Sequence, residues 1–461
     1  MTLPPFRQLA RLRPVALVAP YGAHETAYDD RSAPASARHR LDVVAPYASV
    51  VAELGDPGDA DGRLELALEA PGDVRLRGWH DTGGRLGLEV TDALGRTSRH
   101  RSRRHGRAAA PVEAVALTLT GPLVTVLSRE AGAWVARGRV DLTGRADVHD
   151  STFAAGLAVT HDWRGTGPAP VRRVVAGPFG QLGLRDLRLV TRPDGSPHRE
   201  GEEVLLTASH AGPGFFAAGH TGVWRLRPVD LTLTHTADLF FTRPDRSGVY
   251  GDHATHLLRD GEEWLVATST WGDFARPSRD RVTTTVGTTG ADLTRGGHVV
   301  TMRPLRVPTD GLDSVGVWDP HLLRDGDRWL VAFVSATKYF SFHPALASGP
   351  TLDTLVLRGA DRDRTATEGV TLTRLPEGLR LLASDGRDGP RRLAARFPVF
   401  DLALSEVGTL DAPYPTNLPW PTVLPHGDGW LMVTFDGTAY GGALPGYGTH
   451  GDVIVLGTGD G

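Results

Sequence analysis

Four acidic residues, Asp186, Asp252, Asp319 and Glu368, open a pattern that recurs along the chain. In each copy the acid is followed by an apolar run, a short turn that contains glycine and a second apolar run. Two apolar runs joined by such a turn are typical of a β-hairpin. The acids therefore begin repeated hairpins, and a repeat architecture brings equivalent residues close together.

Carboxylates that converge in this way have a recognisable chemistry. Like charges in a partly desolvated cavity separate one another's pKa values, so that one group stays protonated while another is ionised. One acid and one base or nucleophile are what the hydrolysis of a glycosidic bond requires. We therefore expect the four carboxylates to surround the mouth of one channel and to carry out acid–base chemistry there.

The spacing of the hairpins predicts the element that positions these acids. A fifth copy begins at Trp420, and successive copies start about 50 to 67 residues apart, which leaves room for four strands in each. Five such repeats indicate a five-bladed β-propeller over residues 177–461. In a propeller the first strand of each blade lies beside the central axis, so residues at the strand starts meet at one mouth of the channel.

The segment before the repeats, residues 41–176, has short strand-like alternation separated by polar turns, for example at 63–69 and 115–120. This spacing indicates an antiparallel β-sandwich. Its pattern resembles the concanavalin-like, jelly-roll lectin fold, most visibly in residues 151–159. Residues 1–40 look like an irregular extension. We thus predict an all-β chain with an N-terminal lectin-like sandwich followed by the propeller.

Aromatic and histidine side chains near the same strand ends are the candidates for substrate binding. Aromatic rings stack on the faces of sugar rings, and histidines beside the acids donate hydrogen bonds to hydroxyl groups or orient a carboxylate. The candidates are Tyr250, Trp271, Trp318, Tyr339, Trp420, His253, His256 and His321.

The starts of the repeats carry motifs of a known group. Trp318-Asp319-Pro320 and Glu368-Gly369 resemble the blade starts of the five-bladed propeller glycosidases, which include arabinanases, β-xylosidases and arabinofuranosidases. Arg185-Asp186 resembles the Arg-Asp-Pro of the more distant invertases and levansucrases, without its proline. The resemblance covers residues 177–461. It implies three catalytic acids, the third of them a glutamic general acid.

The resemblance leaves two assignments of the acids open, because in the family they come from the first three blades and Glu368 begins the fourth repeat here. If the blade numbering is offset, Asp252, Asp319 and Glu368 are base, modulator and acid. Otherwise Asp186, Asp252 and Asp319 carry the chemistry, with an aspartic acid as donor. The second and third repeats are the best preserved, so we expect a site centred on Asp252 and Asp319.

Composition restricts the partners and the location. A net charge of −4 gives no electrostatic reason to expect binding to nucleic acid or to an anionic membrane. No apolar run is long enough to span a bilayer. Arg11, Arg13 and Pro14 interrupt the apolar residues near the start, so we expect no signal peptide and a cytoplasmic protein as the sequence stands. Secretion of a longer precursor stays open.

No cofactor is expected. The chain has no cysteine, which excludes disulfides and thiolate metal sites. The histidines form no His-Glu-x-x-His motif, so no metal site is predicted, although a central-channel histidine leaves room for a structural calcium ion. A Gly-x-Ser-x-Gly nucleophile motif is also absent.

Two functions from different classes follow. The first is an enzyme that cuts or transfers a glycosyl unit in the propeller funnel, with a furanose such as arabinose or fructose as the expected sugar. The sandwich would then hold the substrate or close one side of the site. The second is a non-catalytic carbohydrate-binding or scaffold propeller, since a fold does not fix a function. Release of reducing sugar from arabinans, xylans and fructans separates the two.

Overall fold

The computed structural model describes residues 3–28, 36–56, 58–274, 281–438 and 451–459. Within these ranges nearly all regular structure is β-strand, which confirms the predicted all-β class. The exceptions are one short α-helix, α1 (Ser151–Ala155), and two 3-10 helices, η1 (Pro20–Gly22) and η2 (Phe216–Ala218). Among the residues described, no helix is both long and apolar enough to cross a membrane.

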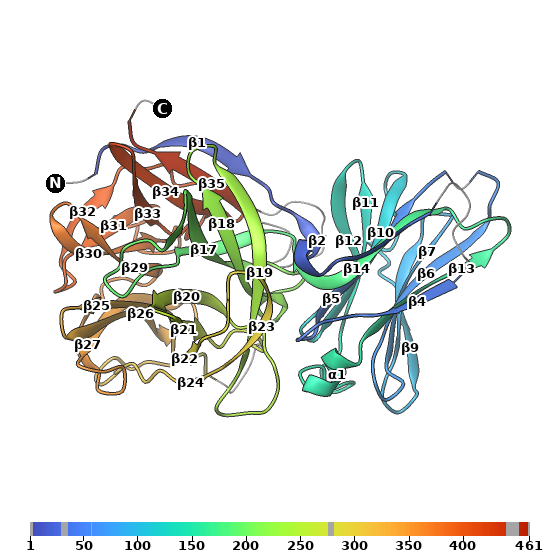
Figure 1. The fold of residues 1–461 in the computed structure, drawn as a ribbon, viewed down its shortest axis with the longest axis horizontal. Helices are drawn as coiled ribbons and strands as arrows, with labels where there is room; N and C mark the ends of the chain where they lie inside the picture. Colours follow the sequence, from blue (N-terminus) through green and yellow to red (C-terminus); the bar gives the residue numbers. More distant parts are fainter. Residues whose placement is uncertain (1–2, 29–35, 57, 275–280, 439–450, 460–461) are drawn as a thin grey trace.

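Two sheets pack face to face in the first part of the chain, on the right in Figure 1. Their strands are β2 (Ala16–Val18), β3 (His24–Ala27), β4 (Ser36–Arg40), β5 (Tyr47–Leu54), β6 (Gly62–Glu69), β7 (Arg75–Asp81), β8 (Leu86–Thr91), β9 (Thr97–His100), β10 (Val112–Thr120), β11 (Leu123–Glu130), β12 (Ala133–Asp141), β13 (Ala158–Gly165) and β14 (Val171–Gln181). One sheet has the order β12-β11-β10-β5-β14-β2, with β3 beside β14, and the other the order β4-β13-β6-β7-β8-β9.

Period-two alternation explains why these two sheets pack together. Leu64, Leu66 and Leu68 of β6 point to one face and are buried against the second sheet, where Leu117 of β10 and Val126 of β11 belong to the same core. The predicted sandwich therefore has its core between the sheets. The segment 151–159, where the resemblance to the lectin fold is most visible, begins with the helix α1, because the Asp150 carboxylate accepts a hydrogen bond from the Thr152 N–H and caps the helix.

Five further sheets, here called blades 1 to 5, follow one another along the chain on the left in Figure 1. Blade 1 contains β15 (Leu184–Leu189), β16 (Arg199–Glu200), β17 (Glu203–His210), β18 (His220–Arg227) and β19 (Thr232–Thr242), with β23 (Gly296–Thr301) parallel to β19. Blade 2 contains β20 (His253–Asp260), β21 (Glu263–Ser269), β22 (Thr284–Thr289) and β24 (Arg303–Pro304). Blade 3 contains β25 (Gly316–Asp325), β26 (Arg328–Lys338), β27 (Ser341–Gly349) and β28 (Val356–Ala360).

The last two sheets have the same design. Blade 4 contains β29 (Thr367–Leu375), β30 (Gly378–Asp385), β31 (Phe397–Phe400) and β32 (Glu406–Leu410). Blade 5 contains β33 (Thr422–His426), β34 (Gly429–Asp436), β35 (Asp452–Gly457) and β1 (Arg7–Leu12). The first strands of neighbouring blades contact one another, β15 with β20, β20 with β25 and β25 with β29, and β15 also contacts β33 and β34 of blade 5. These contacts place blades 5, 1, 2, 3 and 4 side by side in that order, with one sheet for each predicted repeat.

The expectation that residues 1–40 form an irregular extension is wrong. β1 pairs antiparallel with β35, with Arg7 opposite Gly457, and Figure 1 shows it running along the outer edge of blade 5. The pairing satisfies the free backbone groups on the edge of β35. Further on, β2, β3 and β4 join the two sheets of the sandwich. The predicted boundary between the sandwich and the propeller, at residue 176, falls inside β14 and stays a proposal.

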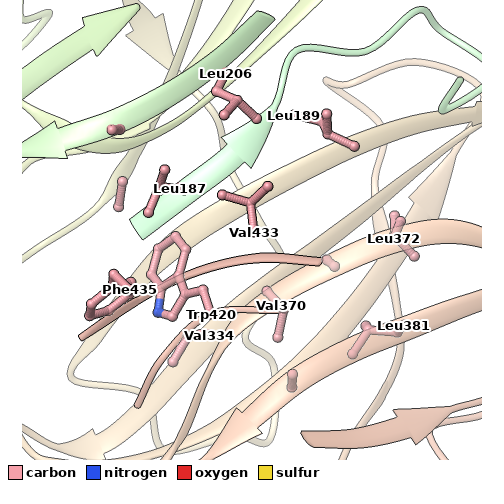
Figure 2. Close-up of a cluster of buried hydrophobic side chains, with 14 of the residues drawn as sticks. Leu187, Leu189, Leu206, Val334, Val370, Leu372, Leu381, Trp420, Val433 and Phe435 are labelled. Carbon is pink, nitrogen blue, oxygen red and sulfur yellow. The ribbon is translucent and has the colours of Figure 1, made fainter. Parts of the chain in front are cut away.

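The largest hydrophobic core lies around the first and second strands of the blades. Figure 2 shows Leu187 of blade 1, Val370 of blade 4 and Val433 of blade 5 in one cluster together with Trp420 and Phe435. All five residues are buried. Trp271, Trp318 and Trp420, near the starts of first strands, also belong to this core.

Candidate active site

A β-bulge recurs near the start of the first strand in blades 1 to 4. The pairing with the second strand shifts register after Arg185, His253, Trp318 and Glu368. In each bulge one residue has a left-handed φ angle, namely Asp186 (53°), Ala254 (62°), Asp319 (56°) and Gly369 (69°). This conformation is strained for most residues, although aspartate tolerates it better than most. A bulge changes the direction of the side chains at its position, and the acids Asp186, Asp319 and Glu368 lie at or next to these bulges.

The bulge corrects the alignment of the second repeat. Measured by its left-handed residue, the equivalent of Asp186 and Asp319 in blade 2 is Ala254, two residues after Asp252. The sequence contains a signal for this offset. Asp319 lies two positions before the His-Leu-Leu of its repeat, whereas Asp252 lies four positions before the His-Leu-Leu of its own repeat. An alignment on His-Leu-Leu would have placed Ala254 opposite Asp319.

Asp252 therefore has a different place, and the expectation of a site centred on Asp252 and Asp319 is wrong for Asp252. Its carboxylate is fully buried and accepts hydrogen bonds from Nε and Nη2 of Arg243, the first at 2.9 Å. It also accepts from the Gly272 N–H at 2.9 Å. Arg243 in turn pairs with Asp273 at 2.6 Å. Because these partners occupy its oxygens, Asp252 is a structural ion-pair residue.

The structure brings the other three predicted acids together. Asp186, Asp319 and Glu368 line one cavity of about 160 Å³ between the first strands of blades 1, 3 and 4. Asp319 and Asp186 are buried, and Glu368 is partly buried. The rest of the wall is mostly aromatic and consists of Arg185, Phe216, His253, Ala254, Trp271, Trp318, Tyr339, Phe340, Phe342, Leu418 and Trp420.

Glu368 has the environment of an acid catalyst. Burial and then the nearby Asp186 carboxylate raise its pKa to about 7, while Arg185 opposes the rise. The Trp420 indole N–H lies 3.5 Å from Glu368 Oε1. A Cβ atom at Gly369 would lie 2.5 Å from the Trp420 ring, so the residue after Glu368 must be glycine both for this contact and for its positive φ. At neutral pH a large fraction of Glu368 carries a proton.

Asp319 lies beside a buried cation. Burial and then the Glu368 carboxylate raise the pKa of Asp319 well above its usual range, and Arg188 opposes the rise. Its carboxyl Oδ2 accepts a hydrogen bond of 3.4 Å from the Gly369 N–H, which links Asp319 to the residue after Glu368. Its own N–H donates to Ser269 Oγ at 2.9 Å. These bonds fix the acid relative to Glu368.

The predicted substrate-binding residues divide into two groups. Trp271, Trp318, Tyr339, Trp420 and His253 line the cavity as expected.

Tyr250, His256 and His321 do not line the cavity, and for them the expectation is wrong. Tyr250 stacks on His149, and its hydroxyl donates to the Ser247 carbonyl at 2.8 Å. His256 and His321 stack on each other in the interior with their ring centroids 3.8 Å apart. They follow the bulge, and the alternation of the strand turns them inward.

Phe216 is a cavity residue that the sequence analysis missed. Its ring stacks on Trp271 with centroids 4.5 Å apart. The loop that carries it is held by the sandwich, because the Tyr47 hydroxyl donates to the Gly219 carbonyl at 2.8 Å and Thr125 Oγ1 donates to the Pro213 carbonyl at 3.3 Å. The sequence feature that could have identified it is the pair of adjacent aromatic residues, Phe215 and Phe216, in a glycine-rich loop.

A buried cluster in blade 1 has residue types that bind metals. His210, His235 and Asp238 place three ligand atoms within 4.8 Å of one another. The Trp224 indole N–H donates to His210 Nε2 at 2.8 Å, and an indole can only donate. Burial lowers the pKa of His210 to about 3, so the ring is neutral and its proton is assigned to Nδ1, 3.2 Å from Asp238 Oδ1. This nitrogen has no free lone pair for a metal, and the cluster is a hydrogen-bond network around a carboxylate.

The central channel does not fit the calcium ion for which the sequence left room. Arg188 of β15 reaches across from blade 1 and donates to the carbonyl oxygens of Asp319, at 3.1 Å, and Val370, at 2.7 Å. Its guanidinium carbon lies 4.6 Å from the centre of the Trp420 ring. Calcium needs six to eight oxygen ligands. Here a guanidinium, itself a cation, already holds two carbonyl oxygens of the channel.

Comparison with known proteins gives low similarity throughout. No protein-family model matches the sequence, and no curated protein matches it. Solved structures that resemble the chain are glycoside hydrolases and related sugar enzymes. A family 117 glycoside hydrolase of Zobellia galactanivorans is 10% identical, with 60% of this chain and 84% of that chain covered and a TM-score of 0.41.

Two other solved structures have similar values. Inulosucrase from Halalkalicoccus jeotgali bound to kestose is 16% identical over 55% of this chain and 76% of its own, with a TM-score of 0.42. A β-xylosidase/α-arabinofuranosidase from a compost microbial metagenome, in complex with xylotriose and in a calcium-free form, is 11% identical over 60% and 93%, with a TM-score of 0.36. At this level of similarity, the function has to be inferred from the site itself.

Proposed function

We propose that the chain is a glycoside hydrolase or transglycosidase whose active site is the cavity of Asp186, Asp319 and Glu368. The observation that carries the proposal is the convergence of three carboxyl groups on one small, aromatic-walled cavity, with the pKa of Glu368 raised to about 7. Cleavage of a glycosidic bond needs a protonated acid and an ionised carboxylate close together. Aromatic walls fit the faces of a sugar ring.

Glu368 is assigned the role of general acid. Its raised pKa keeps a proton available at neutral pH, where an ordinary glutamate is ionised. The proton goes to the oxygen of the leaving group as the bond between that oxygen and the anomeric carbon breaks.

Asp186 is assigned the role of base or nucleophile. It accepts the proton of the attacking water, or it first bonds to the anomeric carbon and is then released by water. The configuration of the product distinguishes these two courses. Asp319 contacts the backbone beside Glu368, and we assign it to positioning and to tuning the acid.

The size of the cavity supports the removal of one terminal sugar unit. At about 160 Å³ it is smaller than the 300–1,000 Å³ typical of sites for drug-sized ligands. Trp318-Asp319-Pro320 and Glu368-Gly369, which resemble motifs of arabinose-releasing enzymes, support a furanose as that unit, and so does Arg185-Asp186, which resembles a motif of fructose-releasing enzymes. Anchoring of the Phe216 loop by Tyr47 supports the sandwich as the element that closes one side of the site.

A panel of arabinan, xylan and fructan oligosaccharides tests the proposal, with release of monosaccharide measured by chromatography. We expect release from at least one furanose-containing member. On that substrate Glu368→Gln and Asp186→Asn should each lower kcat by about 100-fold or more while the protein stays folded. Asp260→Asn, in a hairpin turn, is the matched control and should leave kcat unchanged.

Substrates with different leaving groups test the assignment of Glu368 as the acid. A 4-nitrophenyl glycoside needs little protonation of its leaving group, so Glu368→Gln should lose far less activity on it than on an oligosaccharide. Equal losses on both would contradict the role. Sugar binding without cleavage of any panel member would favour the carbohydrate-binding alternative.

A further inference from the structure

A second hollow lies behind the aromatic wall of the active-site cavity. It has a volume of about 640 Å³ and is lined by residues of blades 2 and 3 and by the segment that follows β19. We call it the outer groove. Its volume lies within the range typical of ligand sites, whereas the active-site cavity is smaller than that range.

The outer groove carries excess positive charge. Arg243 and Arg246 line it, and both pair with Asp273, at 2.6 and 2.8 Å; Arg243 also pairs with Asp252, and Arg246 with Asp245, another lining residue. Arg281, just before β22, and Arg306, just after β24, also line it and are exposed. Within the described part of the chain neither of these two arginines forms an ion pair. Two guanidinium groups are therefore available to an anion that enters the groove.

Hydroxyl groups line the same hollow. Thr283 lies just before β22, Thr309 and Ser314 lie on the connection between β24 and β25, and all three are at least partly exposed. A hydroxyl group donates one hydrogen bond and accepts others, so it matches the hydroxyls of a sugar. Guanidinium groups, in contrast, match carboxylate or sulfate oxygens through paired N–H donors. Together these groups match a molecule that is both polyhydroxylated and anionic.

One layer of side chains separates the groove from the active-site cavity. Phe274 lines the groove, and its ring centroid lies 5.1 Å from that of Trp271 and 5.0 Å from that of Tyr339, which both line the cavity. Val282, another groove residue, donates its N–H to the Tyr339 hydroxyl oxygen at 3.1 Å. The two hollows therefore lie one layer of side chains apart.

We infer that the outer groove binds the anionic part of the substrate, so that the enzyme acts on acidic saccharides carrying carboxylate or sulfate groups next to the released unit. This inference rests on the proposed glycosidase function. Arg281 and Arg306 are its specificity-determining residues. Because they are exposed, each ion pair contributes modestly and weakens as salt is added.

Binding without turnover gives the direct test. The full-length Glu368→Gln variant is titrated calorimetrically at 20 mM salt with tetragalacturonic acid, with its methyl ester and with a sulfated galactotetraose. The methyl ester has the same shape without the charge. We expect the acid to bind about tenfold more tightly than its ester, and 0.5 M salt to remove most of that preference. A tighter sulfated probe would identify sulfate as the preferred group, and a tighter uronate would identify carboxylate.

A matched pair of double variants locates the preference. Arg281→Gln with Arg306→Gln in the same background should abolish it. Arg103→Gln with Arg104→Gln removes the same charge from exposed positions in the sandwich and should leave it intact. Equal binding of acid and ester, or equal effects of the two double variants, would overturn the inference.

Turnover of the wild-type protein separates the two proposals. If neutral furanosides are cleaved but no charge preference exists, the outer-groove inference fails and the glycosidase proposal stands. If the preference depends on Arg281 and Arg306 while no saccharide, neutral or acidic, is cleaved, the catalytic proposal fails and the groove remains a binding site for acidic saccharides.

Discussion

Arg188 donates a hydrogen bond from Nη2 to the backbone carbonyl of Asp319, 3.1 Å away across the channel. The same guanidinium donates from Nη1 to the Val370 carbonyl at 2.7 Å. Burial lowers the pKa of Arg188 to about 10, which still leaves it charged at neutral pH. One planar cation thus ties the first strand of blade 1 to those of blades 3 and 4, directly beside an acid of the candidate site.

Replacing Arg188 by lysine tests this tie. A lysine keeps the charge, but its single ammonium group cannot reach both carbonyls as the two nitrogens of the planar guanidinium do. One buried acceptor loses its donor, so we expect unfolding free energy to fall by about 1–3 kcal/mol in chemical denaturation. Arg199→Lys is the control, because exposed Arg199 donates to the Pro425 carbonyl at 3.3 Å, and should change stability by less than about 0.5 kcal/mol. Equal effects would contradict the bridging role.

The pH dependence of turnover should follow the proton of Glu368. With its pKa raised to about 7, the acid form is lost above that pH. On an oligosaccharide substrate we therefore expect kcat/KM to fall about tenfold for each pH unit above about 7 to 8. A profile measured between pH 4 and 10 checks this. A plateau that extends to pH 9 would show that Glu368 does not act as the acid.

Glu368 should also affect stability, with a definite sign. Its ordinary pKa is 4.5, and burial raises it to about 7 in the folded protein. Between these pH values the folded state binds more protons than the unfolded state. The stabilisation that protonated Glu368 provides at low pH is therefore lost as the pH rises from about 4.5 to 7. Glu368→Gln should flatten this slope in denaturation series at several pH values. An unchanged slope would mean that the carboxyl is better solvated than its position indicates.

Asp252→Asn should be a stability variant that retains turnover. The change weakens the buried pair with Arg243, which has Asp273 as its remaining carboxylate partner. We expect a loss of about 2–5 kcal/mol in unfolding free energy, with kcat within threefold of wild type at a temperature where the protein is folded. Asp319→Asn is the contrast and should lower kcat by about 100-fold or more. Loss of turnover in fully folded Asp252→Asn would return it to the active site.

Tyr47→Phe tests whether the sandwich positions the wall of the site. The change removes the hydrogen bond from the Tyr47 hydroxyl to the Gly219 carbonyl, next to the 3-10 helix that carries Phe216. We expect KM to rise several-fold with kcat little changed, and stability to fall by about 1 kcal/mol. Tyr28→Phe, on another part of the sandwich, is the control. The same stability loss with an unchanged KM would show a purely structural bond.

Local patterns were sufficient to predict the hairpins of the blades. The turn at Asp260 and Gly261 joins β20 to β21, and that at Asp325 and Gly326 joins β25 to β26, as their sequences indicate. Glycine at these turns adopts the positive φ that the turn needs. Alternating apolar residues then fix which face of each strand is buried.

The details of the site were less predictable, because they depend on register and on contacts between distant segments. Asp252 was misplaced because it lies two residues before the left-handed position of its repeat, Ala254, an offset that an alignment on the acids cannot detect. In the sequence, Arg188 cannot be distinguished from any other arginine in a strand. Only the arrangement of the blades around the channel places it against Asp319 and Val370. β1 was missed because its partner, β35, lies at the other end of the chain.

The pairing of β1 with β35 also has a consequence for synthesis on the ribosome. Arg11 of β1 and Asp452 of β35, which form an ion pair, are 441 positions apart. At about 5–20 residues per second, roughly 20 to 90 s pass between the emergence of the two strands. During that time β1 has no partner strand, and an unpaired strand is a site of aggregation. Blade 5 can therefore be completed only late in translation, and the nascent chain has to keep β1 from pairing elsewhere until then.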